Sequence, residues 1–310
     1  ATLPASLESP RALHIGAFRI DRLLIGKLVD GQPAPPDLEF TALAGALASD
    51  GRQHRLTGLS LTAPFGQLGA DLELDGRRPF PLKATARLAT RQADQAWAVQ
   101  ASASGDLENL TPDATASGAG MDGTAAIVAT PFAPLPLKSA VLKLVGLDPS
   151  RFSAAAPRAA LDIDATLEPS VAPGAGKPAA ADWIVSGPLR IVNHQPGSYD
   201  SGALPLESLA ASVRWAGGEL AFSGLDLRLP GKGRGEGSAR WQAPRGDEKN
   251  GFGAVDAELR ITGLDARRLD TRAVATRIAG SIEARADAEP QTVSVGLRGP
   301  QLALRDDARH

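Results

Sequence analysis

Hydrophobic and polar residues alternate along many short stretches of this chain. In residues 161–168, LDIDATLE, apolar side chains occupy every second position, and Asp, Thr or Glu fill the positions between them. Successive side chains of a strand point to opposite faces, so this period of two predicts a strand with one apolar and one polar face. The same alternation recurs at 71–76, 212–215, 224–231, 292–299 and 301–306.

Turn sequences separate these stretches. Asp75-Gly76, Gly217-Gly218 and Pro230-Gly231 are typical of turns and hairpins. The 33 glycines and 24 prolines favour many turns over long helices. Residues 136–146, PLKSAVLKLVG, fit a helical period and a strand period almost equally, and the flanking prolines favour a strand. The predicted fold class is therefore all-β.

The chain is predicted to be one continuous repetitive segment over residues 1–310. Stretches rich in proline, glycine or polar residues without a period predict loops or weak breaks at 31–36, 170–180 and 243–251.

An internal repeat supports this organisation. Residues 146–167 begin GLDPSRF and residues 263–284 begin GLDARRL, while GDLENL at 105–110 is a weaker copy. Each segment predicts a strand end, a turn, a short extended stretch and a new alternating strand. Repeats with an amphipathic face are typical of elongated, stacked architectures.

Composition excludes several function classes. The formal net charge of the 310 residues is −2, from 33 basic and 35 acidic residues, which predicts no nucleic-acid partner. Without cysteine, neither a disulfide framework nor a thiolate metal site can form. No apolar stretch approaches 18 residues, and the chain begins ATLPASLESP without Met. We expect a piece of a longer protein whose targeting signal or anchor lies upstream.

The remaining motifs give little indication of a catalytic, metal-binding or phosphate-binding site. The run GKGRGEG at 231–237 lacks the spacing of a phosphate-binding loop, and the four histidines are scattered. Asp162 and Asp164 share a strand face about 7 Å apart, but with Thr166 and Glu168 they complete a solvated face. We predict no catalytic residues, no metal site and no cofactor.

The apolar face of these strands must be covered, and the pattern leaves two solutions open. A β-sandwich or a solenoid with a filled core, structural or adhesin-like, covers the face with its own side chains, and the pattern alone slightly favours it. A single sheet curled into a gutter would instead hold lipid chains. The aromatic content of 4% suits an unfilled lumen and argues against an enzyme with aromatic platforms for polysaccharide.

Four stretches resemble the TamB family, the inner-membrane-anchored subunit of the bacterial translocation and assembly module, related to AsmA-like bridge-like lipid transfer proteins. They are LTGLSLTAPFGQLGADLELDGRRPFPLKATARL (56–88), VGLDPSRFSAAAPRAALDIDATL (145–167), residues 187–241 and GLDARRLDTRAVATRIAGSIEARAD (263–287), together over half the chain. The motifs are diffuse repeats, so the resemblance lies in their order and density.

This resemblance implies an elongated, curled single sheet, a β-taco or open solenoid-like groove, with an apolar concave face. It implies a periplasmic conduit for glycerophospholipid acyl chains, linked to assembly of outer-membrane proteins and autotransporters. The full-length protein would be anchored in the inner membrane by a helix absent here, and its partner would be the outer-membrane barrel TamA. The alternative is a structural or chaperone-like β-solenoid with a filled core that cradles outer-membrane protein strands.

The predicted groove lining follows from the apolar positions of the alternating stretches. It consists of Leu72, Leu74, Leu161, Ile163, Leu167, Val213, Trp215, Leu225, Leu227, Leu229, Val293 and Val295.

Overall fold

A computed structural model describes most of the chain as two compact units, Ala1–Lys138 and Ser139–His310. The described residues are 3–25, 28–29, 32–33, 38–63, 66–90, 96–133, 135–152, 156–171, 183–243, 254–286 and 293–304. At 25, 28–29, 32–33, 38, 284–286 and 293–304 only the backbone is described.

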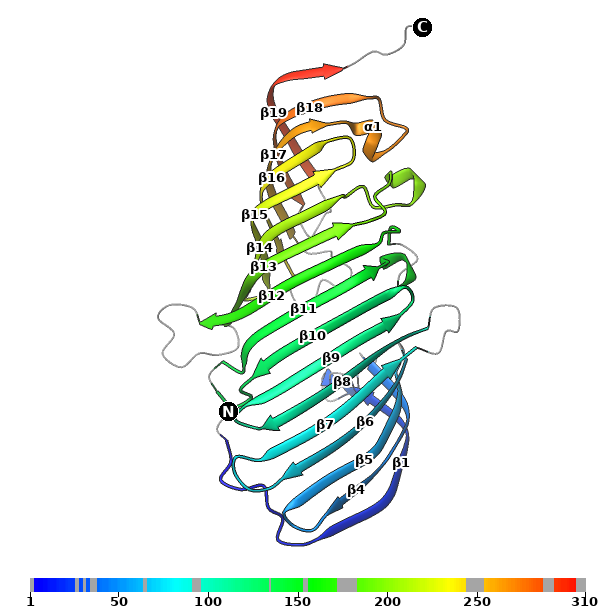
Figure 1. Ribbon diagram of the computed structural model, residues 1–310, viewed down its shortest axis with the longest axis vertical. Coiled ribbons are helices and arrows are strands. Elements are labelled where there is room, and N and C mark those ends of the chain that lie inside the picture. The colour runs from blue at the N-terminus through cyan, green and yellow to red at the C-terminus, as the bar shows by residue number, and fades with distance from the viewer. Residues whose placement is uncertain are drawn as a thin grey trace. The chain divides into compact units, whose positions relative to one another are not determined.

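Unit 1 is an antiparallel meander of long strands (Figure 1). In chain order the strands are β1 (Leu13–Ile25), β4 (Leu38–Ser49), β5 (Gln53–Ala63), β6 (Gly66–Asp75), β7 (Pro81–Ala89), β8 (Trp97–Asp106), β9 (Leu110–Gly118) and β10 (Met121–Ala129). Each pairs with the next in this order. A separate two-residue ladder joins β2 (Leu28–Val29) to β3 (Gln32–Pro33).

Unit 2 continues the same way of folding. Its strands are β11 (Leu137–Leu147), β12 (Leu161–Val171), β13 (Trp183–Asn193), β14 (Ser208–Ala216), β15 (Glu219–Leu229), β16 (Gly233–Gln242), β17 (Ala254–Leu264), β18 (Thr276–Ala286) and β19 (Val293–Leu304). Consecutive strands pair antiparallel. Short helical turns lie in the loops, namely η2 (Pro149–Arg151), η4 (Tyr199–Ser201) and α1 (Ala266–Leu269).

The prediction of an all-β chain is confirmed, and so is the strand predicted at 136–146, which is β11. The stretches 292–299 and 301–306 are, however, one strand, β19. Gly299 and Pro300 lie at a register shift opposite Gly280. A proline without an N–H is tolerated at such a bulge, which explains why a turn-like dipeptide does not end the strand.

The predicted loops fall mostly outside the described residues. Of 31–36, Gln32–Pro33 form β3, and of 170–180, residues 170–171 belong to β12. Residue 243 is described, and the rest of 243–251 is not.

The internal repeat corresponds to a β-bulge. At Gly146, two residues of β11 oppose one residue of β12, and at Gly263 two residues of β17 oppose one of β18. The φ angles are +71° and +64°, a left-handed conformation that glycine adopts without steric cost. The same geometry recurs at Gly58 and Gly224. Bulges of this kind bend a strand and increase its twist, so each of these hairpins carries its own bend.

The aspartate of the repeat caps a helical turn. Asp148 accepts a hydrogen bond from Ser150 N at 3.2 Å before η2, and Asp265 accepts one from Arg267 N at 3.1 Å before α1. The predicted turn is therefore a capped helical turn in both copies, and in the first copy an isolated bridge between Arg158 and Ala203 follows it. A capped helical turn precedes the new strand in both copies, because the Asp carboxylate satisfies backbone N–H groups that an extended chain would leave to solvent.

Candidate functional site: the apolar sheet face

Directly paired residues of an antiparallel sheet share a face, so the register of unit 1 defines cross-strand rows. The central row consists of Leu59, Ala70, Ala86, Ala101, Ala114 and Ala125, one residue from each of β5 to β10. A flanking row on the same face begins with Leu68, Leu88 and Val99. The middle of this apolar face therefore carries small side chains, with larger ones beside them.

A cavity of about 620 Å³ lies over the central row. Ala70, Ala86, Ala101 and Ala114 line it, and so do polar neighbours such as Asp71 and Gln100. Methyl side chains leave free volume above the sheet that leucine would fill.

The register of unit 2 brings the predicted lining residues of this unit to one face. One cross-strand row contains Ile163, Ile191, Leu209 and Leu227, each directly paired with the next. The row from Val213 runs through Phe222, Ala239, Ala257 and Ala284 to Val295, and the row from Trp215 runs through Leu220, Trp241, Val255 and Ala286 to Val293. Leu161 and Leu167 lie on the same face of β12 as Ile163, and Leu225 and Leu229 lie on the same face of β15 as Leu227.

These residues are covered to different degrees. Leu161 and Leu225 are buried, whereas Trp215 is 41% exposed. The other predicted lining residues whose side chains are described, including Leu72 and Leu74 of unit 1, are half-buried. The side chains of Val293 and Val295 lie outside the described residues.

Sequence reasoning missed the central alanine row. Ala84 and Ala86 in β7, and Ala101 and Ala103 in β8, alternate with polar residues as regularly as the leucines do. The alternation was present in the sequence, but alanine is too weakly apolar to identify a buried face unless neighbouring strands are aligned.

No family model, curated protein or solved structure matches this chain. Among the described residues, no helix has both the length and the hydrophobicity needed to cross a membrane. The same residues contain no group of three or more His, Asp or Glu side chains placed to hold a metal ion.

The opposite face of unit 2 is charged. Asp164 lies directly opposite Lys143 of β11 on one side and Arg190 of β13 on the other. Arg234 bridges Asp226 at 3.2 Å and Glu236 at 3.0 Å. Alternating charges of this kind belong on a solvated sheet face.

Asp162 does not have the solvated role that its position in the alternation predicts. It is half-buried, and its carboxylate accepts hydrogen bonds from the bulge amide Gly146 N at 3.0 Å and contacts His194 Nε2 at 2.7 Å. The Gly146 N–H, and then His194, lower the pKa of Asp162. Asp71 accepts a hydrogen bond from Gly58 N at 2.8 Å in the same way, so each of these two carboxylates stabilises a bulge.

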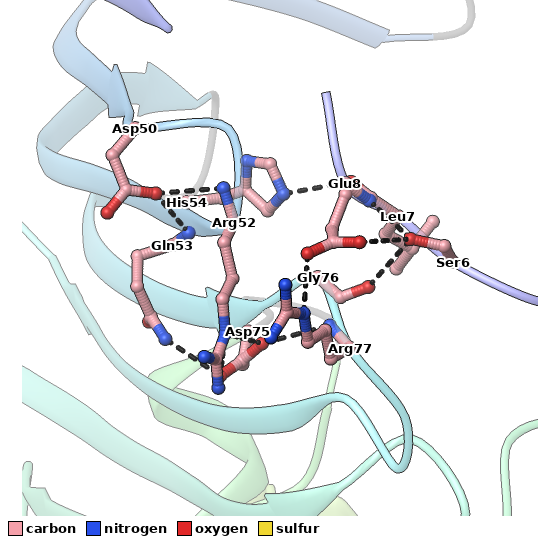
Figure 2. A network of polar contacts seen from close by, with 10 residues as sticks. All are labelled: Ser6, Leu7, Glu8, Asp50, Arg52, Gln53, His54, Asp75, Gly76 and Arg77. Atoms are coloured by element: carbon pink, nitrogen blue, oxygen red, sulfur yellow. Dashed lines mark hydrogen bonds and ion pairs between the residues drawn. The ribbon is translucent and has the colours of Figure 1, made fainter. Parts of the chain in front are cut away.

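A polar network holds the strand ends of unit 1 (Figure 2). Asp75, predicted to lie on a polar face, is only 8% exposed and accepts hydrogen bonds from Arg52, Gln53 Nε2 and Arg77 N. The Arg52 guanidinium, together with the Arg77 N–H, lowers the pKa of Asp75 to about 2. Gly76 N donates to Arg52 O at 2.7 Å, which ties the β4–β5 turn to the β6–β7 turn.

The N-terminal segment crosses both turns. Leu7 N donates to Gly76 O at 2.8 Å, and Ser9 N donates to Gly51 O at 2.7 Å. Glu8 pairs with Arg77 at 2.6 Å, and His54 Nε2 lies 3.0 Å from Leu7 O. This segment therefore fixes the spacing between two hairpins of unit 1.

Proposed function

We propose that this chain is a TamB-like, periplasmic segment of a lipid conduit. Its apolar sheet face would hold glycerophospholipid acyl chains in transit between the inner and outer membranes, without catalysis. One observation carries the proposal: in each unit, the described apolar side chains of the amphipathic sheet are mostly half-buried rather than buried beneath a second layer.

The small buried core supports an uncovered face. Within the described residues, the buried apolar side chains include few large ones; only Phe80 is fully buried. A sheet that has not used its apolar face for its own packing can offer that face to a guest.

Side-chain exposure supports a concave apolar side. Along β9 the apolar-row positions Pro112, Ala114 and Ala116 are half-buried, whereas Asp113 and Thr115 are exposed. Side chains converge and shield one another on the inside of a curled sheet and diverge on its outside. Bulges bend strands, so the Gly-Leu bulges favour such a curl. They are the four bulges at Gly58, Gly146, Gly224 and Gly263, in each of which the glycine is followed by leucine.

The energetics suit transport rather than tight binding. Moving one methylene from water to an apolar wall is worth about 0.8 kcal/mol, so an acyl chain of a dozen methylenes rarely escapes to water. The five strands β5 to β9 span about 19 Å, enough for one acyl chain, which reaches across about half of a 30 Å hydrocarbon core. An even lining of alanine and leucine favours sliding because no position is much preferred.

The partners follow from the same proposal. Phospholipid acyl chains are the direct ligand of this segment, and the inner membrane and the barrel TamA are partners of the full-length protein. The formal charge of −2 on the chain gives no reason to include a nucleic acid.

Two measurements test the proposal. Native mass spectrometry of the purified chain should find phospholipid bound, and its absence after purification from a lipid-containing source would contradict the conduit.

A photo-crosslinking residue at Ile163 should label acyl chains, while the same residue at the exposed neighbour Asp164 should not. Equal labelling from both positions would show that the assigned face is wrong.

A second candidate function is supported by β1, which among the described strands has its register defined with β4 alone. β1 exposes Leu13, Ile20 and Leu24 by 43–48%, and an apolar edge strand can add a further strand by backbone pairing. Such an edge would suit a cradle for unfolded outer-membrane protein strands. Crosslinks from β1 to protein rather than lipid would favour this function.

A further inference from the structure

The loops that follow β11, β13, β15 and β17 lie at one end of the unit 2 strands and form a rim there (Figure 1). This rim comprises residues 148–152, 156–160, 194–207, 230–232 and 265–275. Arg158 N donates to Gly202 O at 2.8 Å, and Leu204 N donates to Arg158 O at 3.0 Å, which joins the first loop to the second. Thr271 N donates to Asp200 Oδ1 at 3.0 Å and joins the second loop to the last.

Two carboxylates of this rim are directed at its own backbone. Asp148 accepts hydrogen bonds from Ser150 N and Ala159 N, both at 3.2 Å. Asp265 accepts them from Arg267 N at 3.1 Å and Thr276 N at 3.0 Å. The negative charges of these groups are therefore engaged within the loops.

Three cations of the rim project into solvent instead. Lys232, Arg267 and Arg268 are exposed, and within the described part of the chain Lys232 and Arg267 form no ion pair. Arg268 reaches Asp265 only at 4.0 Å, with its side chain 67% exposed. A Cβ on Gly231 would lie 2.7 Å from Arg268 Cγ, so the Arg268 stem lies against the β15–β16 turn at the residue that precedes Lys232.

We propose that Lys232, Arg267 and Arg268 bind the phosphodiester of a lipid headgroup. This inference rests on the proposed function, because an acyl chain on the apolar face leaves its headgroup in water near the ends of the strands. Guanidinium groups bind phosphate oxygens with paired hydrogen bonds, and lysine adds a mobile charge. The rim carboxylates already bonded to backbone amides do not compete, so the cluster favours headgroups with a net negative charge.

The test compares two triple variants with the same change in charge. Lys232→Gln/Arg267→Gln/Arg268→Gln removes the cluster, and Arg190→Gln/Arg214→Gln/Arg260→Gln removes three exposed cations from the polar sheet face. Each 310-residue chain is incubated with vesicles of equal phosphatidylglycerol and phosphatidylethanolamine, and the extracted lipids are measured by mass spectrometry.

The wild type and the sheet-face variant should both enrich phosphatidylglycerol. The enrichment should fall by about fivefold for each rim cation removed at low salt. Unchanged enrichment in the rim variant, or an equal loss in the sheet-face variant, would overturn the rim assignment while leaving lipid carriage intact.

A second readout is independent of lipid carriage. Titration with glycerophosphoglycerol, the water-soluble headgroup, should shift the backbone amide NMR signals of α1 and the β15–β16 turn in the wild type but not in the rim variant. If no lipid is extracted at all, the proposed lipid conduit is contradicted, and this titration alone tests phosphate binding by the rim. The absence of shifts overturns phosphate binding, and equal shifts with inorganic phosphate overturn the assignment to a headgroup.

Discussion

Single carboxylates hold the bends and the turns of this sheet. Asp75 is a strand-terminal residue that pairs with Arg52, which lies 23 residues earlier in the chain. The carboxylate is almost fully removed from solvent, yet it is satisfied by four donor groups from Arg52, Gln53 and Arg77. Buried charge is tolerated when it is paired and hydrogen-bonded in this way.

The lowered pKa of Asp75 predicts an acid-sensitive link between the β4–β5 and β6–β7 turns. A carboxyl whose pKa is about 2 when folded and about 3.9 when unfolded contributes stability above pH 4, and this contribution is lost as the pH falls through 2. Hydrogen-exchange protection of the Gly76 amide, which bonds Arg52 O, should therefore decrease over this range in the wild type.

In Asp75→Asn, protection of that amide should already be low at pH 7 and should change little towards pH 2. The matched control is Asp122→Asn, at an exposed position of β10, which should behave as the wild type. A steep loss of protection between pH 4 and 2 that persists in Asp75→Asn would show that another group is responsible.

At the scale of elements, the recurring Gly-Leu bulge determines how strands bend. The Gly58 φ angle is +60°, and a Cβ there would meet no atom within 4 Å. Gly58→Ala therefore tests backbone strain without a clash, and it should lower the free energy of unfolding by about 1–2 kcal/mol. Urea unfolding, with hydrogen exchange of β5 and β6, measures the loss.

Gly69→Ala in the paired strand β6 is the matched control. Its Cβ would lie 3.7 Å from Leu59 O, an ordinary contact, and its φ angle is not in the left-handed region. We expect no loss of stability there, because alanine reduces the entropy of the unfolded chain. Equal destabilisation by both variants would contradict the role assigned to the bulge.

Much of the element level was predictable from local sequence. The alternation at 161–168 predicts β12 because a period of two is a property of the strand alone. The repeat at Gly146 and Gly263 was visible in the sequence, but a bulge needs a pairing partner, and the sequence alone contains no register. For the same reason, Gly299-Pro300 resembles a turn until its opposite residue, Gly280, is known.

The candidate site was predictable in part. Leucines such as Leu225 and Leu227 are placed on one face by alternation, whereas Ala86 and Ala101 become a row only when separate strands are aligned. The roles of Asp75 and Asp162 depend on partners distant in sequence, so they follow from tertiary structure alone.

At the scale of the whole molecule, we expect large side chains introduced on the apolar face to take the place of bound lipid. Ala86→Trp/Ala114→Trp places two large side chains in the cavity of about 620 Å³ over β5 to β9. Because indole would occupy the volume proposed for an acyl chain, lipid bound per chain should fall, as counted by native mass spectrometry.

The control places tryptophan on the other face. Thr85 and Thr115 are exposed neighbours of the two alanines, and Thr85→Trp/Thr115→Trp should leave the lipid count unchanged. If both double variants retain as much lipid as the wild type, the alanine row is not where acyl chains lie.

The bulge within individual hairpins has a consequence for how such a protein can evolve. Since several hairpins carry a bend of their own and each strand pairs with its neighbours in sequence, curvature does not depend on a closing contact elsewhere. Duplication or loss of one hairpin would then change the number of strands and leave the bends of the other hairpins unchanged. Homologues of different length should accordingly differ by whole hairpins rather than by longer strands.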